Sequence, residues 1–207
     1  GTPLIVALFW GHGDVARLLA GHGVTPRNLR AAAGLDDVDL LDELLPTSGP
    51  TAAAGAHRAF YRPHGGFPAW RPSDNPREVV DEALSWAARA NTTRAIDRLA
   101  ASGADLDADV YRGTPLTWAA ANGHTDAVRL LLRLGADPDR RGTFGGHTHG
   151  RGVTALHLAA QHDHVEVIRA LLDAGADLTA ADDEYRSTPA GWAAHFGNHA
   201  AAAALAG

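Results

Sequence analysis

Residues 113–137 of this chain read GTPLTWAAANGHTDAVRLLLRLGAD, and residues 153–177 read VTALHLAAQHDHVEVIRALLDAGAD. The two segments align at a threonine, an Ala-Ala pair, a Leu-Leu pair and a closing Gly-Ala-Asp. Self-similarity at a fixed period indicates a repeat architecture, in which each unit buries its apolar face against its neighbours. Folds of this kind usually serve as binding scaffolds, so the repeat already favours recognition over chemistry.

Related patterns recur along the 207 residues and predict six helical pairs. The spacing is regular where nothing intervenes, since Trp86 and Trp118 are 32 residues apart and Thr154 and Thr188 are 34 apart. We expect a single domain over 1–207, with pairs at 1–24, 25–45, 77–109, 110–142, 150–183 and 184–207. The second pair is degenerate, and two insertions, 46–76 and 140–152, interrupt the series.

The recurring residues have physical roles in helical pairs. A threonine before a proline caps a helix, because its hydroxyl accepts an unpaired backbone N–H and proline suits the first helical position. The Leu-Leu pairs supply an apolar stripe. Glycines at 103, 135 and 175 suit the left-handed conformation that ends a helix. Trp86, Trp118 and Trp192 occupy equivalent positions and are expected in the core.

Together, Thr-Pro-Leu, Ala-Ala, the central Gly123-His124, Leu-Leu and Gly-Ala-Asp resemble the ankyrin repeat, in a bacterial-type protein with two loop insertions. The resemblance covers 1–24 and 78–206, and weakly 26–45, where Thr-Pro-Leu-His and the closing Gly-Ala-Asp are missing. It implies an all-α solenoid of about six helix-turn-helix units, with hairpin loops and a concave recognition face. The motif histidine, His157, is expected to hydrogen-bond between units.

The same resemblance places the partner-binding surface. In ankyrin repeats this surface is formed by the two residues after Ala-Ala and by those just before Thr-Pro. The matching positions here are Phe9, Trp10, Arg89, Tyr111, Arg112, Asn122, Gln161, His162, Tyr185, His195 and Phe196. Aromatic residues and arginine are enriched at interface hot spots. For Phe9 and Trp10 the alternative is that a preceding unit or the 46–76 insertion covers them.

The first insertion, 46–76, changes character halfway. Its first half consists of small residues and is expected to be a flexible linker. Its second half contains Tyr61, Arg62, His64 and Trp70 between prolines and glycines. A loop this long is usually functional or disordered, and its aromatic residues favour docking onto the stack. The insertion either seals the weak second unit or forms a wall of a ligand pocket.

The second insertion, 140–152, reads RRGTFGGHTHGRG and contains Arg141, His147, His149 and Arg151. Three interpretations stay open: a cationic loop for an acidic partner or phosphate, a structural hairpin, and a metal site. His147 and His149 alternate and would share one side of an extended strand. Zinc or copper needs at least one further ligand, so a lone His-x-His is a weak signal and no metal is assigned.

Composition limits the other classes. The net charge of −6 argues against a nucleic-acid surface. No apolar run reaches the roughly 18 residues that a membrane span needs. Cysteine is absent, which removes disulfides and cysteine nucleophiles. With no signal or lipidation motif in view, we expect a cytoplasmic protein.

The beginning of the chain carries its own expectations. Methionine is absent and the sequence opens within a repeat motif, so we expect residues before Gly1 in the natural protein. An uncapped edge with Val6, Phe9 and Trp10 could support a homodimer, because terminal repeats without a cap expose apolar surface.

No catalytic signature stands out among the motifs. The sequence lacks a Gly-x-Ser-x-Gly elbow, a phosphate loop and a His-Glu-x-x-His helix. Acidic residues such as Asp182 and Asp183 are expected mostly at exposed turns or helix starts. We therefore predict a noncatalytic scaffold that binds another protein on its concave face, without a cofactor. The alternative is a small-molecule, metal or catalytic site that the two insertions form with the groove.

Overall fold

The computed structural model describes residues 2–23, 25–45, 73, 75–142 and 151–206. Within these residues all regular secondary structure is helical, apart from one isolated antiparallel bridge between Gly142 and Val153. The chain divides into two compact units, residues 1–105 and 106–207. The predicted all-α repeat fold is confirmed, whereas the single six-unit domain stays a prediction.

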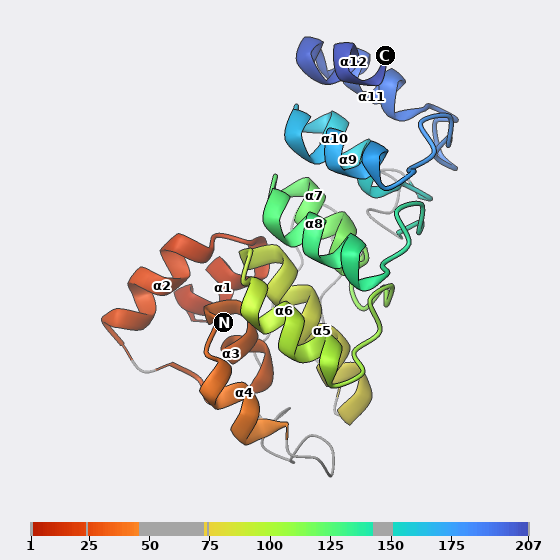
Figure 1. The fold of residues 1–207 in the computed structure, drawn as a ribbon. Coiled ribbons are helices and arrows are strands. Elements are labelled where there is room, and N and C mark those ends of the chain that lie inside the picture. The colour runs from red at the N-terminus through yellow and green to blue at the C-terminus, as the bar shows by residue number, and fades with distance from the viewer. Residues whose placement is uncertain (1, 24, 46–72, 74, 143–150, 207) are drawn as a thin grey trace. The chain divides into compact units, whose positions relative to one another are not determined.

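The first unit holds three consecutive helical hairpins (Figure 1). They are α1 (Pro3–Trp10) with α2 (Gly13–Gly21), α3 (Leu29–Leu35) with α4 (Val38–Leu44), and α5 (Pro76–Ala90) with α6 (Thr93–Ala101). Helix α3 packs on α5 and α4 on α6, while α1 contacts both α3 and α5. Leu8, Leu29, Leu84, Ile96 and Leu99 are fully buried and form the interior of this unit.

Small residues at the end of α3 let α1 approach closely. A Cβ at Gly34 would lie 2.7 Å from Cδ2 of Leu8. That distance is well inside van der Waals contact, so the leucine occupies the space that a side chain at position 34 would fill. The hydroxyl of Thr92, the residue before α6, donates to the carbonyl of the neighbouring Ala33 at 2.7 Å. The small residues of the degenerate second hairpin therefore allow α1 to contact α5 as well as α3.

A buried ion pair joins α3 to α5. The guanidinium of Arg30 is paired with the carboxylate of Glu82, and both side chains are almost wholly buried. Ser73 belongs to the same network, because its carbonyl accepts from Arg30 at 3.0 Å and its N–H donates to Glu82 at 3.2 Å. Burial raises the pKa of Glu82, and the neighbouring arginine opposes that shift. Removing one member of such a pair is costly, because the other charge is left buried.

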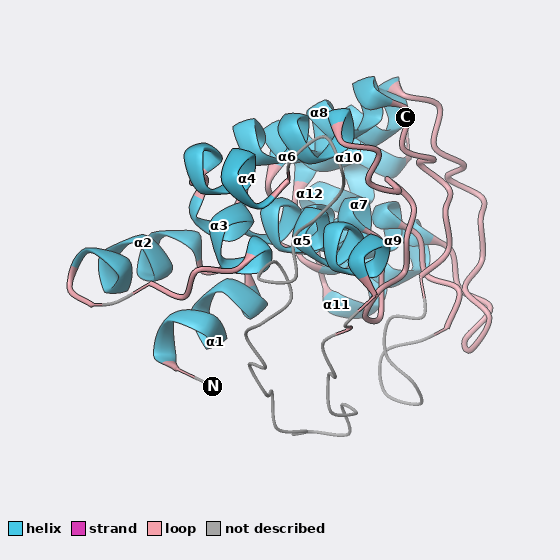
Figure 2. Cartoon of the chain, turned by 90° about the horizontal axis from the view of Figure 1, so that it is seen from below, coloured by secondary structure: helices cyan, strands magenta, loops and turns pink. Residues whose placement is uncertain are grey.

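The second unit holds three hairpins in the same order along the chain (Figure 1). They are α7 (Pro115–Ala121) with α8 (Thr125–Leu134), α9 (Ala155–Gln161) with α10 (Val165–Asp173), and α11 (Pro189–Phe196) with α12 (His199–Leu205). Helix α9 packs between α7 and α11, and α10 packs between α8 and α12. Figure 1 shows the loop that joins α10 to α11 running out from the helices, and Figure 2 shows the helices in cyan and the loops in pink.

The local chemistry predicted for the hairpins is confirmed. The hydroxyls of Thr2, Thr114 and Thr188 each accept a backbone N–H from the first turn of the following helix. Gly103, Gly135 and Gly175 have φ of 85°, 104° and 87°, in the left-handed region. The three equivalent tryptophans are buried, as expected.

Candidate functional site

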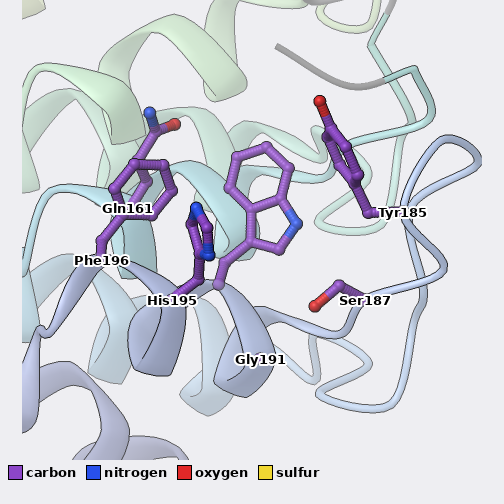
Figure 3. Close-up of a pocket in the computed structure, with 7 residues that line it drawn as sticks. Gln161, Tyr185, Ser187, Gly191, His195 and Phe196 are labelled. Atoms are coloured by element: carbon purple, nitrogen blue, oxygen red, sulfur yellow. The ribbon is translucent and has the colours of Figure 1, made fainter. Parts of the chain in front are cut away.

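A pocket of about 800 Å³ opens in the second unit, on the side where α9 and α11 end. Figure 3 shows its lining side chains pointing toward a common space. The lining residues are Gln161 from α9, Tyr185 and Ser187 from the loop before α11, and Gly191, Trp192, His195 and Phe196 from α11. A concave, largely aromatic pocket with a few polar groups is the usual form of a recognition site.

Helix α11 supplies most of the wall because of its spacing. Trp192, His195 and Phe196 are at i, i+3 and i+4, so they share one face of the helix. The rings contact one another, with centroid separations of 6.2 Å for Trp192 and Phe196 and 5.0 Å for His195 and Phe196. Gly191 leaves space for the hydroxyl of Ser187, since a Cβ at position 191 would overlap that oxygen.

Asp182 holds the loop that carries Tyr185. Its carboxylate is fully buried and accepts from the backbone N–H of Glu184 at 2.9 Å, Tyr185 at 2.6 Å and Ser187 at 3.0 Å. It also accepts from Nε1 of Trp192 at 3.0 Å. One side chain thus fixes both the loop and the indole of the pocket wall.

These hydrogen bonds keep Asp182 ionised. Burial acts to raise the pKa of Asp182, but the hydrogen bonds from Tyr185, Trp192, Ser187 and Glu184 together hold that pKa below its ordinary value. The sequence expectation that acidic residues lie mostly at exposed turns therefore misses this one. Its four hydrogen-bond donors all lie within ten residues of it in the chain. An aspartate that begins a tight turn was therefore the sequence signal that could have indicated a structural role for Asp182.

His157 ties α9 to the same loop. Its Nδ1 accepts from the N–H of Thr154 at 3.2 Å, and its Nε2 lies 3.0 Å from the carbonyl of Ser187. A proton on Nε2 of a neutral ring satisfies both contacts. Burial lowers the pKa of His157, which favours this neutral form. The predicted bond from the motif histidine to the next hairpin is confirmed.

The structure brings four of the predicted partner-binding residues together. Gln161, Tyr185, His195 and Phe196 all line the pocket. Tyr185 and Phe196 remain 59% and 48% exposed, so their rings are available to a partner. His162 is exposed beside this group, and its ring stacks on that of His164 at 5.8 Å.

Other predicted contact residues lie elsewhere in the second unit. Tyr111 and Arg112 are buried, with the carbonyl of Tyr111 accepting from Nε1 of Trp118 at 3.1 Å. Asn122 follows α7 and is half-buried. Arg112 and Arg186, which precede equivalent threonine motifs, both have positive φ, of 65° and 54°.

In the first unit, Phe9 and Arg89 lie in the interior. Each is only 1% exposed, and the Arg89 guanidinium stacks over the Phe9 ring at 4.8 Å while donating to the Phe9 carbonyl at 2.7 Å. The Phe9 ring also meets that of Trp86 at 6.4 Å. Trp10 is half-buried beside them, with its ring 5.3 Å from that of Phe9. These contacts favour a packing role for Phe9 and Arg89.

Most of the candidate ligand site falls in the insertions. Tyr61, Arg62, His64, Trp70, His147 and His149 lie outside the described residues.

At the edges of the second insertion, Arg141 and Arg151 are described and exposed. Arg141 pairs with Asp183 at 2.8 Å, and the carbonyl of Arg151 accepts from the N–H of Asp183 at 2.8 Å. In the part of the chain that the structure describes, no cluster of three or more His, Asp or Glu could hold a metal ion.

Comparison with protein families agrees with this architecture. The family described as ankyrin repeats (3 copies) matches residues 29–142, and the one described as ankyrin repeats (many copies) matches 116–172 and 156–206. The chain therefore belongs to the ankyrin repeat family, as the repeat motif predicts.

Similar curated proteins share only part of their length with this chain. A mitochondrial disaggregase of Bos taurus is 33% identical over 47% of this chain and 19% of its own length. A probable E3 ubiquitin-protein ligase, XBOS33, of Oryza sativa subsp. japonica is 42% identical over 41% of this chain and 15% of its own length. Ankyrin repeat and SOCS box protein 11 of Homo sapiens is 40% identical over 39% of this chain and 23% of its own length. The chain thus matches less than a quarter of each of these relatives. None of its described helices combines the length and apolar character that crossing a membrane requires.

Proposed function

We propose that this chain is a noncatalytic scaffold that binds another protein on the concave face of its repeats. Ankyrin repeats generally mediate protein–protein interaction, and the family membership supports that class. The observation that carries the finer proposal is the pocket on α9 and α11, where four residues chosen by their motif positions line one cavity.

The pocket has the composition of an interface anchor point. Hot spots are enriched in tryptophan, tyrosine and arginine, and they sit in pockets that partner side chains fill. The Trp192 indole is held by its hydrogen bond to Asp182, so the site needs little ordering when a partner arrives. Tyr185 and Phe196 offer exposed ring surface in the same pocket (Figure 3).

The alternative function would use the two insertions to enclose a small molecule, a metal or a reacting group. Its candidate residues lie outside the described part of the chain, apart from Arg141 and Arg151, and no specific observation favours it. A cytoplasmic location and a homodimer through the first hairpin also stay predictions. Val6 on α1 is 38% exposed, which is compatible with the latter.

A selection from a random peptide library displayed on phage tests the proposal. We expect enriched peptides that bind the whole chain, and that lose at least tenfold in affinity when Phe196 or Tyr185 is changed to alanine. Leu178→Ala is the matched control, because Leu178 is similarly exposed, at 46%, but does not line the pocket. Peptides that bind equally well to all variants would place recognition elsewhere. A library with no enriched binder would count against a peptide-binding face.

A further inference from the structure

The pocket on α9 and α11 has aromatic walls. Neither lysine nor arginine is among the described residues that line it. Tyr185 and Phe196 are exposed (Figure 3), and Trp192 lines the same pocket. The face of an aromatic ring attracts a cation held within about 6 Å of its centroid, and tryptophan does so best.

A buried negative charge is hydrogen-bonded to this wall. The carboxylate of Asp182 is 3.0 Å from Nε1 of Trp192. Within the described residues, no arginine forms an ion pair with it, and its hydrogen bonds come from neutral N–H groups. The same carboxylate acts on a neighbouring ring: burial lowers the pKa of His157, and the hydrogen bond to Ser187 and the charge of Asp182 oppose that shift.

The rim of the pocket carries charges of both signs. Asp183 is engaged by Arg141, and Glu184 is exposed next to Tyr185. Arg186 follows Tyr185 in the chain and is exposed, but it does not line the pocket. Among the described residues that line the pocket, only His195 can carry a positive charge.

We propose that this pocket is a subsite for a positively charged side chain, arginine or lysine, of the bound partner. The inference rests on the proposed function and specifies its ligand. The guanidinium or ammonium group stacks on the aromatic faces, and its charge complements Asp182 through the indole. An apolar side chain would fill the same volume but would leave that carboxylate without a counter-charge.

Two small probes separate charge from shape. N-acetyl-arginine methylamide and N-acetyl-citrulline methylamide have nearly the same size, but only the first is charged. Each is titrated into isotope-labelled whole chain, and the indole N–H signal of Trp192 is followed in a proton–nitrogen correlation spectrum. That signal is identified by its absence in Trp192→Phe. We expect the arginine probe to shift it at millimolar concentration, with an affinity at least about fivefold higher than that of citrulline.

Substitution of the exposed rings tests whether they provide the preference. Tyr185→Leu and Phe196→Leu keep apolar surface but remove a π face, so both should reduce the arginine-to-citrulline ratio toward one. Leu178→Ala should leave the ratio unchanged. Because all three side chains are exposed, these variants are expected to fold, which the unchanged remainder of the spectrum would verify.

Two results would overturn the proposal. Equal affinity for the two probes, or no shift with either, means that the pocket does not select a cation. If selected phage peptides still depend on Phe196 in that case, the protein-binding function stands and only the subsite is wrong. If neither peptides nor probes bind, both proposals fail.

Discussion

At the scale of single residues, Asp182 is the side chain on which the candidate site most depends. It receives four hydrogen bonds in a buried position, and asparagine in its place has only one oxygen to accept them. We predict that Asp182→Asn lowers the free energy of unfolding by at least about 2 kcal/mol, because buried donors lose their acceptor. Urea denaturation of the whole chain, followed by far-ultraviolet circular dichroism, measures this. Asp173→Asn, at an exposed residue of α10, should change little, and similar stabilities for both variants would refute the role of Asp182.

His157 gives the second unit a pH dependence. Burial depresses its pKa in the folded state below the ordinary 6.5. Below that pH the unfolded chain binds a proton that the folded chain excludes, so protonation favours unfolding. We predict that the contribution of His157 to stability is fully present above pH 6.5 and is lost as the pH drops from there toward the depressed folded-state value.

The slope of unfolding free energy against pH between 7 and 5 measures the effect. His157→Gln should flatten the slope, whatever its effect on stability at neutral pH. His199→Gln, at an exposed position of α12, should leave the slope as it is. An unchanged slope in His157→Gln would show that other groups carry the dependence.

At the scale of helices, Gly34 decides how closely α1 packs on α3. Because Leu8 occupies the space beside it, a branched side chain at this position must displace the Leu8 side chain, which is itself fully buried, or push the helices apart. We predict that Gly34→Val destabilises the chain by about 1–3 kcal/mol, the usual cost of overpacking. Gly21→Ala is the control, since nothing lies within 4 Å of a Cβ there.

The double variant Leu8→Ala with Gly34→Val adds a second test of the same contact. Truncating Leu8 leaves a void that the valine can enter, so the two substitutions should interact favourably in thermal denaturation. Strictly additive effects would mean that the strain lies elsewhere.

The same scale shows what the sequence could and could not predict. Helix starts at Thr2, Thr114 and Thr188 were predictable because a cap and its helix are adjacent in the chain. The Arg30–Glu82 pair was not, because its members are 52 residues apart and belong to a degenerate repeat. The sequence left open whether Phe9 is covered, but it did not predict the contact with Arg89, because the two residues are 80 positions apart in the chain. For the pocket, alignment identified residues but not the loop conformation that brings Tyr185 to α11.

At the scale of the whole chain, the two compact units raise the question of whether each can fold alone. Residues 106–207 have their own interior, in which Leu116, Leu131 and Leu156 are almost completely buried. In repeat proteins stability is approximately a sum of unit and nearest-neighbour terms, so a run of three hairpins can retain structure. We predict that the fragment 106–207 is helical and unfolds in a measurable thermal transition, and that the Trp192 indole signal keeps its chemical shift because Asp182 and its donors are all present.

The fragment with Leu156→Ala is the matched variant for this experiment. The cavity left at that position should lower the free energy of unfolding of the fragment by about 2–5 kcal/mol, as for other buried leucines. A fragment that lacks a transition, or that Leu156→Ala does not affect, would show that the second unit cannot form its interior without residues 1–105. Folding of the six hairpins would then have to be treated as one process, and the predicted single domain over 1–207 would gain its first direct support.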